Sequence, residues 1–287
     1  MRVPSVQEKK VVVTGCSTGI GAATARVLRD VGWRVVPTAR REEDLALLRG
    51  EGFEAVALDV ADSDSVKQCV QEVLDLFGGR IGGLVNNAGY GQAGAVEDLS
   101  REALRRQFEV NVFGMQELTN GFIPAMREQG WGRIVNISSV LGRISVPMMG
   151  AYCASKFAME ALSDSLRVEL ADAGIGVSLV EPGPIESAFR NTAADAAAKS
   201  LDTEHSRFSG YYDKEIGRRL KKKKSSNKFM KPPEAVAEKI LHALTASNPK
   251  ARYCVTIPAY LGAWMSRFSP TGLNDRILRG RVPAPGR

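Results

Sequence analysis

Two side chains that can take part in proton transfer stand one helical turn apart in the segment Tyr152-Cys153-Ala154-Ser155-Lys156. Residues four positions apart on a helix are neighbours, so the phenol and the ammonium group would share one face. A tyrosine in water has a pKa near ~10, too high for a general base at neutral pH. An adjacent cation favours the phenolate and lowers that pKa. Such pairs also arise by chance on many helices, so whether this one is catalytic must be judged from the surrounding residues.

Polar residues of the right kind precede this pair. Ser138 and Ser139 directly follow the buried run 133–137, which we interpret as a strand. A serine hydroxyl at this place can donate to a carbonyl oxygen. Asn111 falls inside a predicted helix between apolar neighbours, where asparagine is usually a mild defect. Alternatively, Asn111 bends the helix around a water that links Lys156 to solvent.

A second group of residues is of the kind that binds a dinucleotide. The buried run 11–14 is followed by Gly15, Gly19 and Gly21 at the opening of a helix. Gly15 permits a tight turn, Gly19 lets the backbone approach a pyrophosphate, and the free N–H groups of the first turn attract an anion. The spacing differs from G-x-G-x-x-G, so the prediction depends on the strand before the glycines and the helix after them.

The end of the second predicted strand bears on the choice of nicotinamide cofactor. A carboxylate at this place accepts from a ribose 2'-hydroxyl, whereas a guanidinium pairs with a 2'-phosphate. No carboxylate occurs here before Glu42, and Arg40 is placed to meet a phosphate. We therefore expect NADP(H), with NAD(H) as the alternative. In the simpler interpretation, Arg40 and Arg41 only begin the next helix and face water.

These residues require a framework that brings strand ends to one edge. From Lys10 onward, β-branched runs alternate with amphipathic segments of helical length, which is typical of a parallel sheet covered on both faces. The expected fold class is α/β: a single Rossmann-like, doubly wound domain over residues 1–287, with a seven-stranded parallel sheet flanked by helices. We predict strands over 10–14, 33–38, 54–58, 81–86, 132–138, 176–181 and 252–257, and helices over about 20–31, 42–49, 64–77, 101–128, 151–172 and 234–246.

Residues from about 188 to 233 interrupt this pattern with small side chains, a tyrosine pair and the basic run Lys221 to Lys224. We interpret them as a helical substrate insertion, or lid, because ligands bind at the carboxyl edge of open α/β sheets. The lysine run would attract phosphate, anionic lipid or an acidic carrier protein, although such runs are more often solvated loops.

Composition excludes several classes of protein. With 287 residues, 44% of them hydrophobic, the chain can bury a large core without metals or disulfides. Its four cysteines form no CxxC pair and it has two histidines, so we expect no metal site, and Cys153 is expected to pack as a small buried side chain. The net charge of +7 comes without a nucleic-acid-binding module. No run of eighteen apolar residues and no secretory signal occur, which favours a soluble, cytoplasmic protein.

These residues together resemble the short-chain dehydrogenase/reductase family, and the resemblance extends to about Pro258. Asn111, Ser139, Tyr152 and Lys156 match the catalytic tetrad of that family. Its spacing to the tyrosine selects Ser139 rather than Ser138. Further motifs match its cofactor loop (TGCSTGIG from position 14), its adenine-side acidic position (Asp59-Val60), the end of its fourth strand (Asn86-Asn87-Ala88-Gly89) and its nicotinamide-side loop (181–187).

The resemblance implies a role for each matched residue. Tyr152 would be the acid in reduction and the base in oxidation, and Ser139 would hold the carbonyl oxygen. Lys156 would lower the pKa of the tyrosine and hold the nicotinamide ribose, and Asn111 would position a relay water. The implied cofactor-binding residues are Gly15, Ser17, Gly19, Ile20, Gly21, Arg40, Asp59, Val60, Asn87, Tyr152, Lys156, Pro182, Gly183, Ile185 and Ser187. The family usually has threonine at the last of these positions.

Three functions follow from this resemblance. The EPGP sequence from Glu181, the end of the second strand and a long carboxyl tail look like the hydroxysteroid and retinol dehydrogenase branch, which implies hydride transfer between NADP(H) and a bulky apolar ketone or secondary alcohol. A 3-oxoacyl-carrier-protein reductase, docked through the basic insertion, is the second enzyme hypothesis. A dinucleotide-binding sensor without chemistry is the third, but a degenerate member would be expected to lose part of the tetrad.

Contacts with other molecules are predicted from the helices and the tail. A homodimer or homotetramer is expected, with helices 101–128 and 151–172 as contact faces. We expect the tail, residues 259–287, to pack over the substrate cleft, and an interfacial membrane helix is the less favoured alternative. The apolar side chains concerned are Tyr260, Leu261, Trp264, Met265, Phe268, Ile277 and Leu278, which lie between basic residues.

Overall fold

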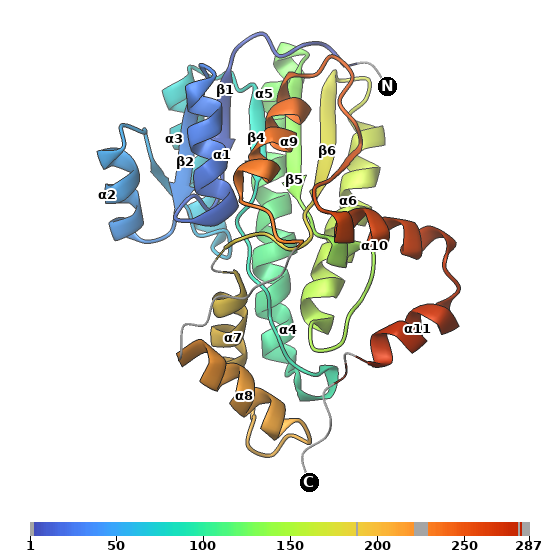
Figure 1. Cartoon of the computed structure of the whole chain (residues 1–287). Helices are drawn as coiled ribbons and strands as arrows, with labels where there is room; N and C mark the ends of the chain where they lie inside the picture. Colours follow the sequence, from blue (N-terminus) through green and yellow to red (C-terminus); the bar gives the residue numbers. More distant parts are fainter. Residues whose placement is uncertain (1–2, 188, 221–228, 281, 283–287) are drawn as a thin grey trace.

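The computed structural model describes residues 3–187, 189–220, 229–280 and 282. One parallel sheet lies between two layers of helices (Figure 1). Its strand order is β3-β2-β1-β4-β5-β6-β7, and every neighbouring pair is parallel. The predicted α/β class and seven-stranded parallel sheet are therefore confirmed. The strands are β1 Lys10–Val13, β2 Arg34–Ala39, β3 Val56–Ala57, β4 Gly83–Asn86, β5 Gly132–Ile137, β6 Ile175–Glu181 and β7 Arg252–Cys254.

The sheet order determines where a ligand can bind. After β3 the chain returns to the other side of β1 and continues outward through β4, so the order reverses between β1 and β4. Ligands of open α/β sheets bind beyond the carboxyl ends of the strands at such a switch point. Strands β4, β5 and β6 are buried along their whole length, as expected for internal parallel strands covered on both faces.

Helices cover both faces of the sheet. Leu28, Leu45 and Ile240 belong to the core cluster on one face, while Phe122 and Leu166 belong to the cluster on the other. Strands β1, β4 and β5 contribute side chains to both clusters, which explains their nearly continuous valine, isoleucine and leucine. The first face carries α1 Gly19–Asp30, α2 Glu42–Gly50 and α9 Glu234–Thr245; the second carries α3 Ser63–Phe77, α4 Arg101–Phe108, α5 Met115–Gln129 and α6 Gly150–Glu169.

The helix predicted over 101–128 is not one regular α-helix. Between α4 and α5, residues Glu109–Gly114 form a π-helical segment, η2, which contains Asn111. Gly114 lies so close to the main-chain carbonyl of Val60 that any Cβ there would collide with it. A π-turn accommodates one extra residue within a helix and often occurs at functional sites. The prediction of an uninterrupted helix was therefore wrong at this point.

Two strand predictions were too long. Strand β3 has two residues instead of the five expected over 54–58. Strand β7 ends at Cys254, because Ile257 and Pro258 already form the first turn of α10. Proline is well tolerated in a first helical turn, where its missing N–H has no helical partner to lose.

The remaining helices lie outside the two layers. In Figure 1, α7 (Phe189–Ser200) and α8 (Ser209–Leu220) lie beyond the carboxyl edge of the sheet, so the predicted insertion is helical. Helices α10 (Ile257–Phe268) and α11 (Thr271–Arg279) form the tail at the side of the molecule. Lys221 to Lys224 lie outside the described residues. Of the helices that the structure describes, none has both the length and the apolar character needed to span a bilayer.

Candidate active site

Three of the predicted catalytic side chains meet at the carboxyl edge of the sheet. Ser139 follows β5 as the N-cap of the 3-10 turn η3 (Val140–Gly142), and Tyr152 and Lys156 lie in the first two turns of α6. All three are buried. The Ser139 side chain is hydrogen-bonded to the Tyr152 phenol, and the Lys156 Nζ lies 5.8 Å from the centroid of the tyrosine ring. The structure therefore brings together a hydroxyl, a phenol and an ammonium group.

The pKa of Tyr152 departs from the sequence-based expectation. Burial raises it well above the ordinary value of tyrosine, and the hydrogen bond with Ser139 only partly opposes this effect. The Lys156 ammonium group donates to the main-chain carbonyl of Ile137 at 2.7 Å instead of pointing at the phenol oxygen. Loss of hydration around a phenolate thus outweighs the neighbouring cation. At neutral pH the phenol keeps its proton, which is the form that can act as an acid.

Lys156 is charged and buried beneath the tyrosine ring. Burial lowers the pKa of its ammonium group to about 8, and the negative charge of Glu160 opposes that change. Glu160 lies one helical turn after Lys156 and is itself buried. The ammonium group therefore remains mostly protonated at pH 7, where it can donate hydrogen bonds at the carboxyl edge.

Asn111 fastens the loop after β4 to the catalytic helix. Its Oδ1 accepts from the Tyr90 N–H at 3.1 Å, and its Nδ2 donates to the Tyr90 carbonyl at 3.0 Å and to the Ser155 hydroxyl at 3.1 Å. Ser155 in turn donates to the main-chain carbonyl of Tyr152. Asn111 therefore acts on the active helix through Ser155, and the role of positioning a water near Lys156 stays a prediction.

The turn between β1 and α1 forms a cradle of the kind that receives a phosphate. Gly15 and Gly19 have φ angles of +69° and +61°, a region that favours glycine. The first turn of α1 contains no acidic residue, and the Thr18 side chain makes no capping bond, so nothing in that turn offsets the partial positive charge of the helix end. A Cβ on Gly19 would lie 3.4 Å from the Cβ of Ser187, an ordinary van der Waals contact, so the loop after β6 faces the cradle at this glycine. The residues fit a dinucleotide pyrophosphate.

Asn87 holds this cradle in place. Its Nδ2 donates to the main-chain carbonyls of Thr14 and Gly15 at 2.8 and 3.0 Å. The Thr14 hydroxyl accepts from the N–H groups of Asn87 and Ala88 at 2.9 and 2.8 Å. The end of β4 is thereby tied to the glycine turn across the switch point. The motif after the fourth strand thus shapes the cofactor loop in addition to any contact with the cofactor.

Arg40 and Asp59 lie together at the outer end of the cradle. The Arg40 Nη1 is 3.8 Å from the Asp59 Oδ2, and the Arg40 side chain is 70% exposed. Arg41, by contrast, forms a two-pronged pair with Asp44 at 2.8 and 2.9 Å. Arg40 therefore has one long ion pair and an exposed side chain that can turn toward a phosphate, whereas Arg41 is held by two short bonds to the first turn of α2.

The closing loop, residues 182–187 after β6, faces the glycine cradle at Gly19. The Pro182 carbonyl accepts from Val140 N–H at 2.9 Å, which joins this loop to the turn after Ser139. Gly183 packs so tightly against the Thr256 hydroxyl that a side chain would not fit, and Ile185 pairs with Lys231 in a β-bridge. Of the remaining predicted cofactor residues, Ser17 and Ser187 are exposed, whereas Ile20 and Val60 pack against the core clusters.

The insertion contacts the catalytic tyrosine directly, which the sequence did not reveal. The ring of Phe189, the first residue of α7, lies 5.1 Å from the ring of Tyr152, at an interplanar angle of 58°. The same side chain rests on Gly91, where a Cβ would come within 2.6 Å of it. An aromatic residue just after the loop 181–187 was the available signal, but only the folded chain shows which ring it meets.

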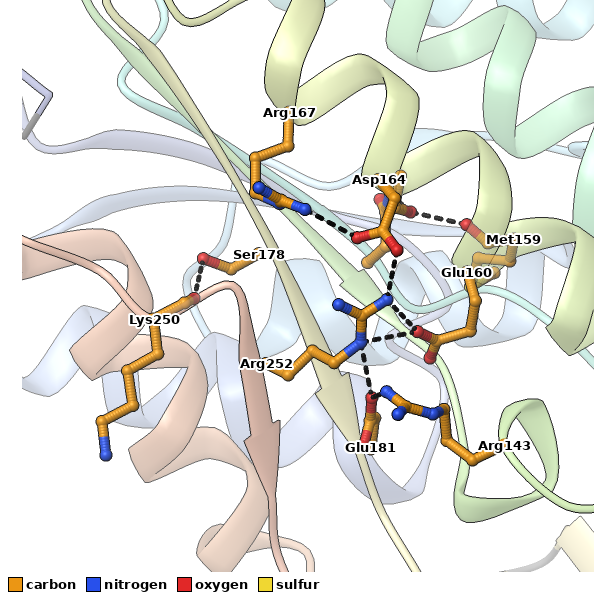
Figure 2. A network of polar contacts seen from close by, with 11 residues as sticks. Arg143, Met159, Glu160, Asp164, Arg167, Ser178, Glu181, Lys250 and Arg252 are labelled. Carbon is orange, nitrogen blue, oxygen red and sulfur yellow. Dashed lines mark hydrogen bonds and ion pairs between the residues drawn. The ribbon is translucent and has the colours of Figure 1, made fainter. Parts of the chain in front are cut away.

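Behind the site lies an ionic network that sequence reasoning also missed. Figure 2 shows Arg252 of β7 between Glu160 and Asp164 of α6 and Glu181 at the end of β6. The nearest nitrogen–oxygen distances are 3.0, 2.7 and 3.1 Å. Arg143, which follows η3, reaches Glu181 at 3.3 Å. The network therefore joins the helix of Tyr152, the strand before the closing loop and the turn after Ser139.

The whole arrangement is that of a nicotinamide oxidoreductase, and comparison with known proteins agrees. The model of the short chain dehydrogenase family matches residues 9–198, a range that includes the glycine cradle and the cluster around Tyr152. The chain belongs to this family. Its members are NAD(P)-dependent oxidoreductases, and this short-chain dehydrogenase is one of them. Among the described residues, no group of histidine, cysteine and acidic side chains is placed to hold a metal ion.

Several relatives match this dehydrogenase over nearly their whole length. Uncharacterized oxidoreductase YbbO of Escherichia coli is 38% identical over 275 residues, covering 96% of each chain. NADPH-dependent 3-dehydrocapnine reductase of Ornithobacterium rhinotracheale is 35% identical and covers 93% of this chain and 95% of its own. Retinol dehydrogenase 16 of Mus musculus is 35% identical, with coverages of 96% and 89%. A solved short-chain dehydrogenase from Streptomyces avermitilis superposes with a TM-score of 0.72 at 32% identity, covering 96% and 95%.

The cradle yields a first testable prediction. In Gly21→Ala the added Cβ would collide with the Gly15 carbonyl, so the helix end must move away from the turn. We expect the Kd for the dinucleotide to rise about tenfold or more, because displaced N–H groups lose a charge-assisted hydrogen bond. Fluorescence titration with NADPH measures this. Gly50→Ala, at a helical glycine with open space around it, is the control, and equal Kd values for the two variants would contradict the cradle.

Proposed function

We propose that this short-chain dehydrogenase uses NADP(H) to interconvert a bulky apolar ketone and its secondary alcohol, a substrate of steroid-like or retinoid-like size. The observation that carries the proposal is the protonated, buried Tyr152 phenol, which is hydrogen-bonded to Ser139 at the same carboxyl edge of the sheet as the glycine cradle. The relatives named as a retinol dehydrogenase and an NADPH-dependent reductase support the substrate class and the cofactor.

The residues of the site divide the chemistry among them. A bound nicotinamide supplies or accepts the hydride. The Ser139 oxygen accepts from Leu141 N–H at 3.1 Å, and its hydroxyl is hydrogen-bonded to the Tyr152 phenol, so the hydroxyl must turn from the phenol to a substrate in order to donate to its carbonyl oxygen. Tyr152 then transfers its proton to that oxygen as the carbonyl carbon is reduced, and the product is the alcohol. A phenol with a raised pKa still suffices, because an alkoxide is a stronger base than a phenolate.

Lys156 and Asn111 hold this arrangement. The Lys156 ammonium group keeps positive charge beneath the phenol ring, where it stabilises the phenolate that remains after proton transfer. By resemblance to the family, Lys156 would also hold the nicotinamide ribose. Asn111 fixes the main chain of the catalytic helix through Ser155 and thereby limits the movement of the Tyr152 side chain.

An apolar substrate is supported by the surfaces around the phenol. Phe189 covers the Tyr152 ring from the insertion, and the insertion packs on the body through an apolar cluster. The cluster comprises Ala95, Met148, Phe208 and Tyr212, with Leu201 and Tyr211 beside it. The Phe189 ring beside the phenol favours a hydrocarbon-rich substrate, because contact between the two removes apolar surface from water.

A parallel substrate screen tests the proposed reaction. Oxidation of NADPH and of NADH would be followed by absorbance with steroid ketones, retinal and a 3-oxoacyl group linked to its carrier protein. We expect turnover of the free apolar carbonyls with NADPH. Turnover confined to the carrier-linked substrate would replace this proposal with an acyl-carrier reductase, and nucleotide binding without any turnover would leave a sensor.

The choice of NADP(H) leads to a second prediction. Arg40→Gln removes the exposed guanidinium at the outer end of the cradle, which has only a long ion pair with Asp59, whereas Arg41→Gln removes one held closely by Asp44. We expect the first variant to raise the KM for NADPH about ten- to a hundredfold, because it loses one charge-assisted hydrogen bond. The KM for NADH should stay nearly unchanged. Steady-state kinetics with both cofactors decide this. If the ratio of the KM values for NADPH and NADH were the same in Arg40→Gln as in the wild type, another residue would bind the 2'-phosphate.

We also infer that the dehydrogenase works in the cytoplasm as a homodimer or homotetramer. The outer faces of the two helices predicted as contact surfaces carry exposed apolar side chains: Leu104 and Phe113 on α4 and η2, and Phe157, Leu162 and Val168 on α6. Such side chains are typical of the core of an interface between subunits. Analytical ultracentrifugation of the wild type and of Phe157→Ser would test this assignment.

A further inference from the structure

The tail does not pack as the sequence suggested. Ile257, Leu261, Trp264 and Phe268 recur at the spacing that places residues on one face of a helix, and they are 67%, 55%, 57% and 65% exposed. Helix α10 touches the body through its opposite side, where Gly262 lies against Val140 and Ile144. The expectation that these aromatic side chains cover the substrate cleft was therefore wrong.

Helix α11 carries further exposed apolar side chains, while its Asp275, Leu278 and Arg279 line a hollow with Ser145, Val146 and Pro147. Leu273 and Ile277 are 49% and 50% exposed, and all residues of α11 are exposed or half-buried. We define the tail surface as the exposed apolar side chains of α10 and α11 with their three arginines, Arg267, Arg276 and Arg279. Asp275 is the single acidic residue between positions 257 and 279. Figure 1 shows both helices at the side of the molecule, outside the layers that cover the sheet.

We propose that the tail surface docks on a membrane whose lipids carry negative charge. An amphipathic helix with aromatic side chains on one face and basic groups beside it lies in the plane of the bilayer interface. Tryptophan and tyrosine are suited to that region, because one end of each ring system is apolar and the other is polar. The tail surface supplies Tyr260 and Trp264 for the interface and three guanidinium groups for the lipid headgroups.

Charge argues for this partner over a second copy of the chain. In a two-fold symmetric interface, the same patch of each subunit faces the other, so the arginines of two tail surfaces would be brought together with one aspartate per copy to offset them. Like charges placed opposite one another oppose association. An anionic bilayer supplies the complementary charge to every arginine at once.

Helix α10 packs beside the elements that surround the active site, so membrane docking would place the site near the bilayer. Ala259 and Thr256 at the start of the helix pack against Gly183 of the closing loop, and Gly262 packs on the turn that follows Ser139. A membrane bound at the tail surface would therefore lie beside the elements that frame the active site. This inference extends the proposed function, since apolar substrates concentrate in bilayers, but the docking stands on the tail surface alone and is tested without turnover.

Trp264 provides a selective probe. The protein has three tryptophans, and Trp33 and Trp131 are 4% and 1% exposed, whereas Trp264 is 57% exposed. Vesicles of phosphatidylglycerol and phosphatidylcholine should shift the tryptophan emission to shorter wavelength, and pure phosphatidylcholine vesicles should shift it much less. Trp264→Phe should lose the shift while still sedimenting with the anionic vesicles. Raising the salt should release the protein, because salt screens attraction to the headgroups.

Paired variants separate the tail surface from general adhesion. We expect Arg276→Gln to weaken binding to anionic vesicles about fivefold, the contribution of one basic side chain near such a surface. Leu261→Ser with Phe268→Ser should abolish sedimentation. Leu47→Ser removes an equally exposed apolar side chain from α2 and should bind like the wild type.

Three outcomes would overturn the proposal. Absence of vesicle binding at low salt would remove the membrane as partner. Equal binding of the Leu261→Ser/Phe268→Ser variant and the wild type would move the contact elsewhere. A Trp264 shift that depends on protein concentration but not on vesicles would assign the tail surface to a second copy. None of these results bears on whether Tyr152 catalyses hydride transfer, which the substrate screen tests separately.

Discussion

Replacing Tyr152 with phenylalanine is expected to lower kcat by about 10²- to 10⁴-fold, the range in which a positioned proton donor contributes. The variant loses the hydroxyl that is bonded to Ser139. It keeps the ring that contacts Phe189 and that lies over the Lys156 ammonium group, so the site should retain its shape. The Kd for NADPH should therefore change by less than about threefold, or ~0.7 kcal/mol. Single-turnover rates and fluorescence titration measure the two quantities separately.

A matched control distinguishes loss of the acid from loss of a phenol in general. Tyr260→Phe makes the same chemical change on the exposed face of α10 and should leave kcat unchanged in the absence of lipid. If Tyr152→Phe turned over at nearly the wild-type rate, another group would have to protonate the substrate oxygen. If it lost NADPH binding as well, the phenol would belong to the cofactor site more than to the reaction.

The local parts of this site were predictable from sequence because they depend on short spacings. Tyr152 and Lys156 are one helical turn apart in any α-helix, and the glycines at 15, 19 and 21 follow a strand and precede a helix. The parallel sheet then places the end of β5, with Ser139, at the same edge as both. These inferences need only secondary structure and the direction of the strands.

The direction of the Tyr152 pKa shift could not be obtained in this way. Sequence gives the cation one turn away but not the depth of burial, and here the burial of the phenol beneath Phe189 dominates. The widened turn around Asn111 has a similar origin, since it lies where Gly114 meets the Val60 carbonyl from another part of the chain. In both cases contacts between distant segments override a local tendency.

For the tail, the sequence predicted the local structure correctly but not the contacts that it makes. Its apolar spacing correctly indicated one-sided helices, but periodicity alone does not say whether the apolar face meets the protein or another molecule. In the folded chain, small residues determine which face of α10 packs against the body. Ala259 and Gly262 allow α10 to approach the body closely, and the large side chains are thereby left on the outer face.

The network of Figure 2 leads to the prediction with the largest effect on stability. Arg252→Met should lower the free energy of unfolding by ~3–5 kcal/mol, because it leaves the buried Glu160 without its cationic partner and Glu181 with Arg143 alone. Glu181 and Glu160 are 1% and 8% exposed, so water cannot replace the guanidinium. Urea unfolding at pH 7 measures the loss. Arg34→Met breaks an exposed two-pronged pair with Glu54 and should cost about 1 kcal/mol or less.

The same variant should show a pH dependence of definite sign. Burial already raises the pKa of Glu160, and Arg252 is one of the groups that oppose this rise. Without Arg252 the pKa of Glu160 rises further, so the folded protein binds a proton that the unfolded chain releases at the same pH. Stability then falls as pH increases through the folded pKa. The deficit of Arg252→Met relative to wild type should therefore shrink toward pH 4.5 and grow toward pH 8.

The double variant Arg252→Met/Glu160→Gln distinguishes an electrostatic cause of the stability loss from a steric one. If an uncompensated carboxylate causes the loss, the amide should recover part of the stability at pH 7 and flatten its pH dependence, because a neutral side chain costs less to bury. A merely steric loss at position 252 would be the same with glutamate or glutamine at position 160. That result would reduce the network to packing, and the coupling between β7 and the catalytic helix would then not be electrostatic.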